Sequence, residues 1–336
     1  MLPARPNARP IQTAVVGASA GGVEALRDLV AELPRDYGGA LLVVLHVAPM
    51  ATSVLPQILT RAGDIPAEHA VDGEEIEAGR IYVAPPDRHL LVSDGRLALD
   101  RGPRINGYRP AIDMLFRTAA DTWGANAVGA VLSGVLDDGT AGLLAIQRRN
   151  GTVLVQDPDE ALYEGMPRSA IEFVRPDFVG SAGAIGRRIA ELAAGPHEPT
   201  EEVRSLPDDV VVEVDRGASD RPQPGEPTGL TCPECNGGIW EHVVDGLPRY
   251  ACRVGHEYGP ETFDAEQAER VEVALWTALR ALEERGALHR RIAARQHAHG
   301  NTRSAEKYSA RADQSVQNAL VLRELIQQPD PQEGVA

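Results

Sequence analysis

A serine, a histidine and two aspartates follow apolar runs of this sequence, in positions where an enzyme could use them. Ser19 lies in the glycine-rich turn of VVGASAGG, and His46 ends the run ALLVVLH. The pair Asp137 and Asp138 follows the run AVGAVLSGVL. A serine nucleophile needs a base to take its proton and a third group to orient that base. If the apolar runs are neighbouring parallel strands, these side chains meet at the carboxyl edge of one sheet.

The turn around Ser19 allows three interpretations. Gly17, Ser19 and Gly21 fit the G-x-S-x-G pattern, in which a strand turns sharply into a helix and exposes a hydroxyl. A dinucleotide-binding loop needs G-x-G-x-x-G, and Ser19 stands where its second glycine should be. Ser19 could also cap a helix that begins near Val23. The residues disfavour the dinucleotide loop and favour a reactive serine, while the cap stays open.

The other histidines lack a comparable position. Apart from His256, which belongs to a cysteine-rich segment, they fall in predicted loops or on polar helix faces, where we expect solvated side chains. These histidines are His69, His89, His197, His242, His289, His297 and His299. Of the two aspartates, Asp137 is better explained by ordinary loop or helix-cap chemistry.

The elements that must position these residues alternate between strands and helices. Buried strands are predicted at TAVVGA and ALLVVLHV, with an amphipathic helix at VEALRDLVAEL between them. The alternation continues through NAVGAVLSG, TAGLLAIQRRNG and GTVLVQD, while HLLVSDGRLALD predicts a hairpin that turns at Asp94 and Gly95. Repeated strand–helix–strand units predict an α/β fold with a doubly wound, mainly parallel, Rossmann-like sheet.

Composition divides the 336 residues into six segments. The part that follows the α/β domain is rich in proline, glycine and acidic residues and lacks periodicity, which is typical of an extended linker. We expect a tail at 1–10, the α/β domain at 11–195, the linker at 196–229, a zinc-ribbon-like unit at 230–260, a helical hairpin at 261–328 and a tail at 329–336.

All three cysteines lie in the segment 230–260. Cys232 and Cys235 form a C-x2-C pair, and Cys252 and His256 form a C-x3-H pair. Thiolates and imidazole at this spacing suit a closed tetrahedral zinc site, which is structural because no coordination position stays open. His242 would replace His256 if that residue does not bind. The alternative is a reduced cysteine pair with an incidental third thiol.

Two amphipathic helices are predicted in the last segment, and they meet at 299–301 as an antiparallel hairpin. Their apolar stripes consist of Val271, Leu275, Ala278 and Leu282, and of Ala312, Val316, Ala319 and Leu322. Each stripe could pack against the other helix or the α/β domain. It could equally form a surface for a homo-oligomer or another partner protein.

Charge and hydropathy exclude several classes of protein. The formal net charge of −16, without a basic run, argues against nucleic acid as a partner. No apolar stretch reaches the roughly 18 residues of a membrane helix, so we expect no direct membrane insertion. Three cysteines make a poor disulfide framework, which predicts a cytoplasmic protein.

Several motifs, in this order, resemble the catalytic domain of the chemotaxis protein-glutamate methylesterases of the CheB type. They are GASAGGVEAL, HVAP, IYVAPPDRHLLV, YRPAIDMLF, VLSGVLDDGTAG and VQDPDEALYEGMPRSAI. The resemblance covers roughly residues 11–190. In that family a serine, a histidine and an aspartate act in this chain order. The resemblance implies Ser19 as nucleophile, His46 as general base and acid, and Asp138 as the orienting carboxylate.

The resemblance also implies the residues around the triad. Val135 stands where the family has methionine, and its backbone N–H would belong to the oxyanion hole. Tyr108, at a position that is often histidine, would face the substrate together with Arg109 and Met166. Arg109 could equally form an internal ion pair, and Met166 could equally fill the core.

The function implied by the resemblance is hydrolysis of glutamate methyl esters on receptor or signalling proteins, without a catalytic cofactor. The same route would deamidate glutamine. Such a role belongs to chemotaxis and to phosphorelay-associated signal transduction. Only about ten residues precede the first predicted strand, so we expect no receiver domain within this chain. The alternative is a catalytically weak or inactive signalling scaffold on the same fold, which acts by binding proteins.

Overall fold

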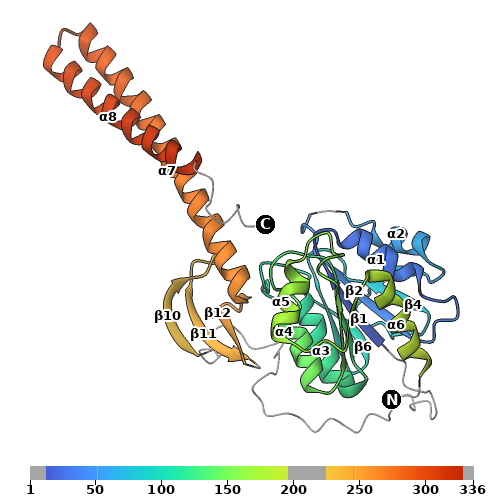
Figure 1. Cartoon of the computed structure of the whole chain (residues 1–336). Coiled ribbons are helices and arrows are strands. Elements are labelled where there is room, and N and C mark those ends of the chain that lie inside the picture. The colour runs from blue at the N-terminus through green and yellow to red at the C-terminus, as the bar shows by residue number, and fades with distance from the viewer. Residues whose placement is uncertain (1–12, 51, 196–224, 245, 328–336) are drawn as a thin grey trace. The chain divides into compact units, whose positions relative to one another are not determined.

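The computed structural model describes residues 13–50, 52–195, 225–244 and 246–327, so both predicted tails and nearly all of the predicted linker lie outside the described residues. The chain divides into two compact units, Met1–Phe263 and Asp264–Ala336, which are described separately (Figure 1).

A seven-stranded parallel sheet forms the centre of the first unit, which confirms the predicted fold class. Its strands have the order β3-β4-β2-β1-β7-β8-β9. They are β1 (Thr13–Ala18), β2 (Ala40–Leu45), β3 (Ala67–His69), β4 (Arg80–Val83), β7 (Val128–Val131), β8 (Thr152–Gln156) and β9 (Phe178–Gly180). The chain builds outward from β1 in one direction and then in the other. The topological switch point, where such sheets bind ligands, therefore lies at the carboxyl ends of β1 and β7.

Helices cover both faces of the sheet (Figure 1). One face packs on α1 (Gly22–Ala31), α2 (Leu55–Ala62) and α6 (Ala182–Ala194). The other packs on α3 (Ile112–Trp123), α4 (Thr140–Arg148) and α5 (Gly165–Phe173), and a short 3-10 helix, η1 (Gly124–Asn126), follows α3. Strand β1 serves both cores, because Val15 faces one helical layer and Val16 faces the other. This double burial explains why its sequence is continuously apolar.

The predicted hairpin is present as β5 (His89–Ser93) and β6 (Arg96–Asp100), which pair antiparallel around the expected turn. The expectation of solvated histidines was wrong at two positions. His89 is completely buried, and its Nε2–H donates to the Pro103 carbonyl at 2.9 Å, while burial lowers the pKa of its imidazole. His289 in the second unit is buried as well.

A four-stranded antiparallel sheet follows in the same unit, and we call it the ribbon. Its order is β10-β11-β12-β13, with β10 (Glu226–Thr231), β11 (Gly238–Val244), β12 (Leu247–Cys252) and β13 (Glu257–Tyr258). β10 begins within the range predicted as linker. The ribbon's small core contains Cys232, Ile239, Cys252, Tyr258 and Phe263, so two of the three cysteines are part of it.

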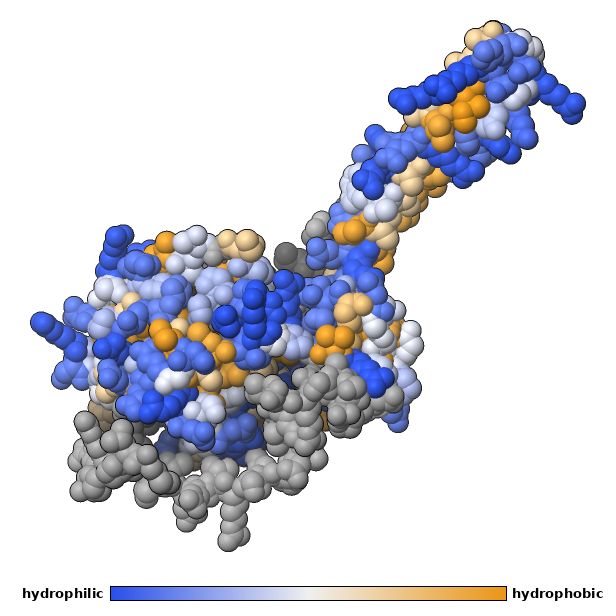
Figure 2. Space-filling view, turned by 180° about the vertical axis from the view of Figure 1, so that it is seen from behind, coloured by the Kyte–Doolittle hydropathy of each residue, from blue (hydrophilic) through white to orange (hydrophobic). Residues whose placement is uncertain are grey.

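The second unit consists of α8 (Thr302–Gln327) and most of α7 (Pro260–Ala298). The two helices are antiparallel, since Arg323 pairs with Glu283 and the ring of Tyr308 contacts His289. Of the predicted stripes, Ala312 and Ala319 are buried, whereas Val271 is 60% exposed. Apolar and hydrophilic side chains both reach the surface of these helices (Figure 2). No described helix has the length and apolar character needed to cross a bilayer.

Candidate active site

Ser19 follows β1 in a turn that only small residues can form. Gly21 has a φ of 69°, and a Cβ there would lie 2.7 Å from the Ser133 Oγ. A Cβ at Gly17 would lie 2.3 Å from a methyl group of Ile112. The Ser19 N–H donates to the Ser133 carbonyl at 2.9 Å, and no side chain caps α1. The Ser19 hydroxyl therefore does not serve as the helix cap that the sequence left open.

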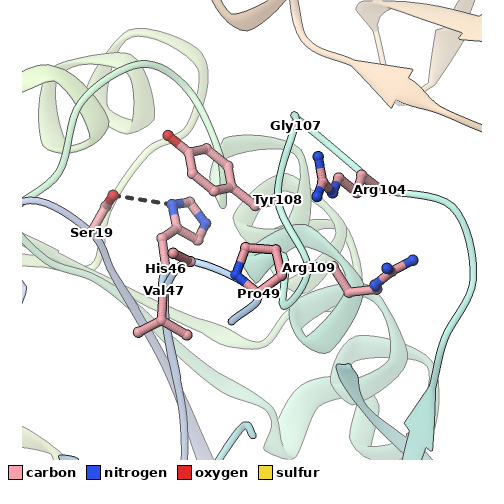
Figure 3. Close-up of a pocket in the computed structure, with 9 residues that line it drawn as sticks. Ser19, His46, Val47, Pro49, Arg104, Gly107, Tyr108 and Arg109 are labelled. Carbon is pink, nitrogen blue, oxygen red and sulfur yellow. Dashed lines mark hydrogen bonds between the residues drawn. The ribbon is translucent and has the colours of Figure 1, made fainter. Parts of the chain in front are cut away.

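His46 follows β2 and lies between the serine and an aspartate. Its Nδ1 is 3.1 Å from the Ser19 Oγ (Figure 3). Its Nε2 is 2.8 Å from Asp138 Oδ2. An ionised carboxylate only accepts hydrogen bonds, so Nε2–H donates to Asp138 and Nδ1 is left to accept the serine proton. Nδ1 thus faces the nucleophile here, the reverse of the usual serine protease arrangement, in which Nε2 does so.

Asp138 is held as an anion by donors on every side. Oδ2 also accepts from the Ile112 N–H at 2.7 Å, and Oδ1 accepts from the Asn106 side chain at 2.7 Å. Ile112 begins α3, so the carboxylate lies at a helix N-terminus. Burial opposes ionisation, but the hydrogen bond and charge of His46 and these N–H donors outweigh it. They hold the pKa of Asp138 below its usual range.

Asp137 has different surroundings. Its carboxylate accepts a hydrogen bond from the Thr262 hydroxyl, and burial raises its pKa. The structure therefore brings Asp138, and not Asp137, to His46.

Two buried residues beside the triad had not been singled out from the sequence. The Asn106 side chain donates to Asp138 and also to Asp113 Oδ2, at 3.0 Å. Asp113 accepts from the N–H groups of Gly139 at 3.1 Å and Gly142 at 2.7 Å. Burial, and then the charge of Asp138, raise the pKa of Asp113. Asn106 precedes Gly107 in a pair typical of a turn, and that turn was the only signal available.

A cleft of about 370 Å³ opens over Ser19 and His46, between residues 47–49 and the loop 104–109 (Figure 3). Tyr108 lines it and stacks on His46, with ring centroids 3.6 Å apart. Arg109 also lines it, but its guanidinium pairs with Asp87 at 2.5 Å and donates to the Gly102 carbonyl at 2.6 Å. The charge of Arg109 is thus used within the protein.

Met166 does not line the cleft. It is fully buried, and a Cβ at Gly134 would lie 2.1 Å from its Sδ. Its position corrects the expectation that it faces substrate, because the thioether fills the space beneath the loop after β7. The same loop exposes Val135, whose side chain is 38% accessible. Within the described residues, the Val135 N–H makes no hydrogen bond, and neither does that of Ala20 next to the serine.

The predicted metal ligands come together in the ribbon. The ligand atoms of Cys232, Cys235, Cys252 and His256 all lie within 4.8 Å of one another, and His242 is outside this group. The Cys235 and Cys252 sulfurs are 3.6 Å apart, and His256 Nδ1 is 3.5 Å from the Cys252 sulfur. Zinc bonds of about 2.3 Å to sulfur and about 2.0–2.1 Å to nitrogen give tetrahedral edges of about 3.5–3.8 Å.

The charge state of one thiol also suits a metal. Hydrogen bonds from the Cys252 thiol and from His256 hold the pKa of Cys232 far below its usual range, although burial opposes this. A thiolate is the form in which cysteine binds metal. The four residues therefore fit a tetrahedral metal ion.

Comparison with known proteins identifies relatives of the first unit. Residues 14–189 match the family described as CheB methylesterase. A protein of Leptospira interrogans, named as a candidate protein-glutamate methylesterase/protein-glutamine glutaminase, is 38% identical over 179 residues, covering 53% of this chain and 91% of that protein. A Yersinia pestis protein-glutamate methylesterase/protein-glutamine glutaminase is 37% identical over 185 residues, covering 54% of this chain and 53% of that protein. This chain thus spans about half the length of the Yersinia relative.

A solved structure is also similar. The CheB methylesterase catalytic domain of Thermotoga maritima superimposes with a TM-score of 0.52 at 32% sequence identity. The alignment covers 55% of this chain and 100% of that domain. The ribbon and the helices that follow it lie beyond the residues matched by the family.

Proposed function

This chain belongs to the CheB methylesterase family, and we propose that it hydrolyses glutamate methyl esters on proteins with Ser19 as nucleophile. The observation that carries the proposal is the unbroken series of hydrogen bonds from Ser19 through His46 to Asp138. The series lies at the switch point of the sheet and opens into the cleft. A serine, a base and an orienting acid in this geometry are the parts that acyl transfer needs.

Each residue of the triad has a defined step. Nδ1 of His46 takes the hydroxyl proton while Oγ of Ser19 attacks the ester carbonyl. Asp138 stabilises the imidazolium that forms, and His46 then gives its proton to the departing methoxide, so that methanol leaves. Water enters, gives a proton to His46 and attacks the acyl-enzyme. His46 then returns that proton to the Ser19 Oγ as the acyl bond breaks, which restores the serine and releases the glutamate side chain as its carboxyl group. General base catalysis of this kind contributes about 10²–10⁴-fold. A glutamine side chain would follow the same steps and release ammonia.

The oxyanion hole is built from backbone N–H groups. Val135 supplies one donor and Ala20, next to the nucleophile, supplies a second; the N–H of Ser19 itself is occupied by Ser133. Because the donor at position 135 is backbone, replacing the family's methionine with valine leaves it in place. Each such donor contributes about 3–4 kcal/mol to stabilisation of the transition state.

The substrate is a methylated receptor or signalling protein, which enters the open cleft through an extended side chain. Tyr108 forms one wall, and Arg109 braces that wall through Asp87. Arg104 lines the cleft as well and pairs with Glu234 at 2.8 Å. A chemotaxis receptor fits this chemistry, and the cytoplasm suits a chain whose three cysteines bind metal as thiolates.

The metal of the ribbon is structural zinc, held by Cys232, Cys235, Cys252 and His256. Four protein ligands leave no open position, so the ion supplies folding energy to the ribbon and takes no part in the hydrolysis. The hydrolysis itself uses no cofactor. Metal analysis of the purified chain should find one zinc ion per molecule, and exchange of Cys232 and Cys252 for serine should remove it.

One experiment separates the esterase from the scaffold. Purified protein is incubated with a methylated receptor peptide, and the released methanol is measured beside labelling by a serine-directed fluorophosphonate. The esterase releases methanol and labels at one site, and Ser19→Ala abolishes both. A protein that folds, neither releases methanol nor labels, and still binds the peptide would be the scaffold.

A further inference from the structure

The ribbon contacts the α/β domain directly behind the triad aspartate. Glu257 of β13 accepts the Asn106 N–H on its carbonyl at 2.7 Å, and its own N–H donates to the Arg104 carbonyl at 3.4 Å. Glu257 and Ile105 form a parallel bridge. Strand β13 therefore pairs with residues 104–106 at the start of the loop 104–108, which lines the active-site cleft.

The Asn106 side chain links the ribbon to the triad. Its amide nitrogen donates to Asp138 and Asp113, as described above. Its oxygen accepts from the Gly259 N–H at 2.8 Å and from Arg249 Nη2 at 3.2 Å. Gly259 and Arg249, which donate to Asn106, lie on the ribbon side of the contact. The two aspartates that accept from Asn106 belong to the α/β domain. The ribbon thereby fixes the orientation of the amide that holds Asp138.

Arg249 brings a positive charge to this contact. Its side chain is 3% exposed and lies 3.3 Å from Asp113 and 2.9 Å from Glu257, which in turn pairs with Arg117 at 3.0 Å. Asp113 and Asp138 form a buried pair of like charges on one amide. A buried charge is stable only with a partner, so Arg249 offsets the repulsion that Asp113 adds beside Asp138.

The loop also reaches the base of the triad, because Tyr108 stacks on His46 only two residues after Asn106. Two of the metal ligands lie close in the chain to the residues that make the contact. Cys252 ends β12, which carries Arg249, and His256 directly precedes Glu257. The Cys252 N–H donates to the His256 carbonyl at 2.9 Å. The backbone that holds the metal ligands is therefore continuous with the backbone that makes the contact, so we expect disorder at one to disturb the other.

We propose that the ribbon is a positioning module for the esterase triad, in which Arg249 is a positioning residue and metal binding is coupled to the alignment of Asp138 and His46. The inference rests on the proposed function, since it assigns a regulation to that same triad. The ribbon acts through Asn106 and the loop 104–108, and it does not touch the substrate.

The test uses the full chain and the variants Arg249→Met, Arg249→Lys and Arg253→Met. Arg253 is an exposed arginine of the same ribbon and serves as the matched control. For each variant we measure the bound zinc and the rate at which a fluorophosphonate labels Ser19. Proton NMR reports the low-field resonance of the His46–Asp138 hydrogen bond. Thermal unfolding reports whether each variant folds.

Arg249→Met should keep its zinc, label at least about tenfold more slowly and lose the low-field resonance, whereas Arg249→Lys should recover part of both. Arg253→Met should match the unchanged chain. Removal of zinc from the unchanged chain by a chelator should slow labelling and weaken the resonance in parallel with the loss of metal. In Arg249→Met, removal of zinc should add little.

Labelling and resonance that persist in folded Arg249→Met would overturn the role of Arg249. If that variant does not fold, the chelator experiment decides, and full labelling without zinc would overturn the coupling. A chain that labels but releases no methanol would contradict the proposed substrate and leave the coupling measurable. If the unchanged chain does not label, the nucleophile assignment fails, while the resonance still reports on the coupling.

Discussion

The ring of Tyr108 lies flat on the imidazole of His46, with centroids 3.6 Å apart and planes only 9° from parallel. The opposite edges of the imidazole are held by the Ser19 and Asp138 side chains. Two hydrogen bonds leave the ring free to tilt about the line that joins them, and a flat neighbour removes this freedom. Stacking therefore completes the orientation of the base.

Replacing Tyr108 with alanine should slow acylation of Ser19 by about 3–10-fold, because a stacked pair contributes about 0.5–1.5 kcal/mol. Tyr108→Phe keeps the ring and should stay within about twofold of the unchanged chain. The labelling rate with a fluorophosphonate measures both. If phenylalanine were as damaging as alanine, the hydroxyl rather than the stacking would be responsible.

Asp138→Asn should reduce the labelling rate and methanol release by about 10²–10⁴-fold. An amide at this position cannot stabilise the imidazolium, and its NH₂ group can present a donor where His46 needs an acceptor. Asp137→Asn is the matched control, since it makes the same change one residue earlier and away from His46. That variant should retain activity, and equal losses in both would argue against Asp138 as the orienting acid.

Asp137→Asn should also stabilise the protein, and the gain should grow with pH. Burial raises the pKa of Asp137, so the folded protein binds its proton more tightly than the unfolded chain does. The stability that this residue contributes is present at low pH and is lost as the pH rises through its pKa in the folded protein. Asparagine keeps an acceptor for Thr262 and never ionises.

Thermal unfolding at about pH 4 and at about pH 7 checks this dependence, with each kcal/mol gained raising Tm by about 2–4 °C. The difference in Tm between variant and unchanged chain should be larger at neutral pH. A larger difference at acid pH would mean that the Asp137 carboxylate stabilises the folded state.

The sheet and the triad could be predicted from the sequence because local patterns carry them. Continuous apolar runs indicate strands buried on both faces, and parallel pairing brings the residues after β1, β2 and β7 to one edge. The residue pattern only made Asp137 the less suitable of the two aspartates, and the role of Asp138 came from the resemblance, because adjacent aspartates in one loop differ mainly in their tertiary surroundings.

The surroundings of the triad could not be predicted in this way. Asn106 contacts Arg249, which is far away in the chain, and no local pattern encodes such a pair. The same reason explains the errors at single residues. Met166 is buried because the loop after β7 packs against its thioether. His89 can be buried because the Pro103 carbonyl accepts its ring N–H.

The loop beneath the oxyanion hole should not tolerate a methyl group at Gly134. A Cβ there would lie 2.1 Å from Met166 Sδ and 2.9 Å from the Ser19 Cβ, so it presses on the loop and on the nucleophile together. Overpacking of this kind costs about 1–3 kcal/mol of stability. Displacement of one oxyanion donor costs about 10²–10³ in kcat, so Gly134→Ala should lose most of its activity while it still folds.

Gly38→Ala is the control for this substitution. Gly38 is exposed, its φ lies outside the left-handed region, and the nearest atom to an added Cβ would be 3.9 Å away. Alanine there should be neutral or add about 0.4–1 kcal/mol of stability, because it restricts the unfolded chain. Unfolding curves and methanol release are measured for both variants. An active Gly134→Ala would show that the loop after β7 can move without losing the oxyanion hole, and would argue against Val135 as its donor.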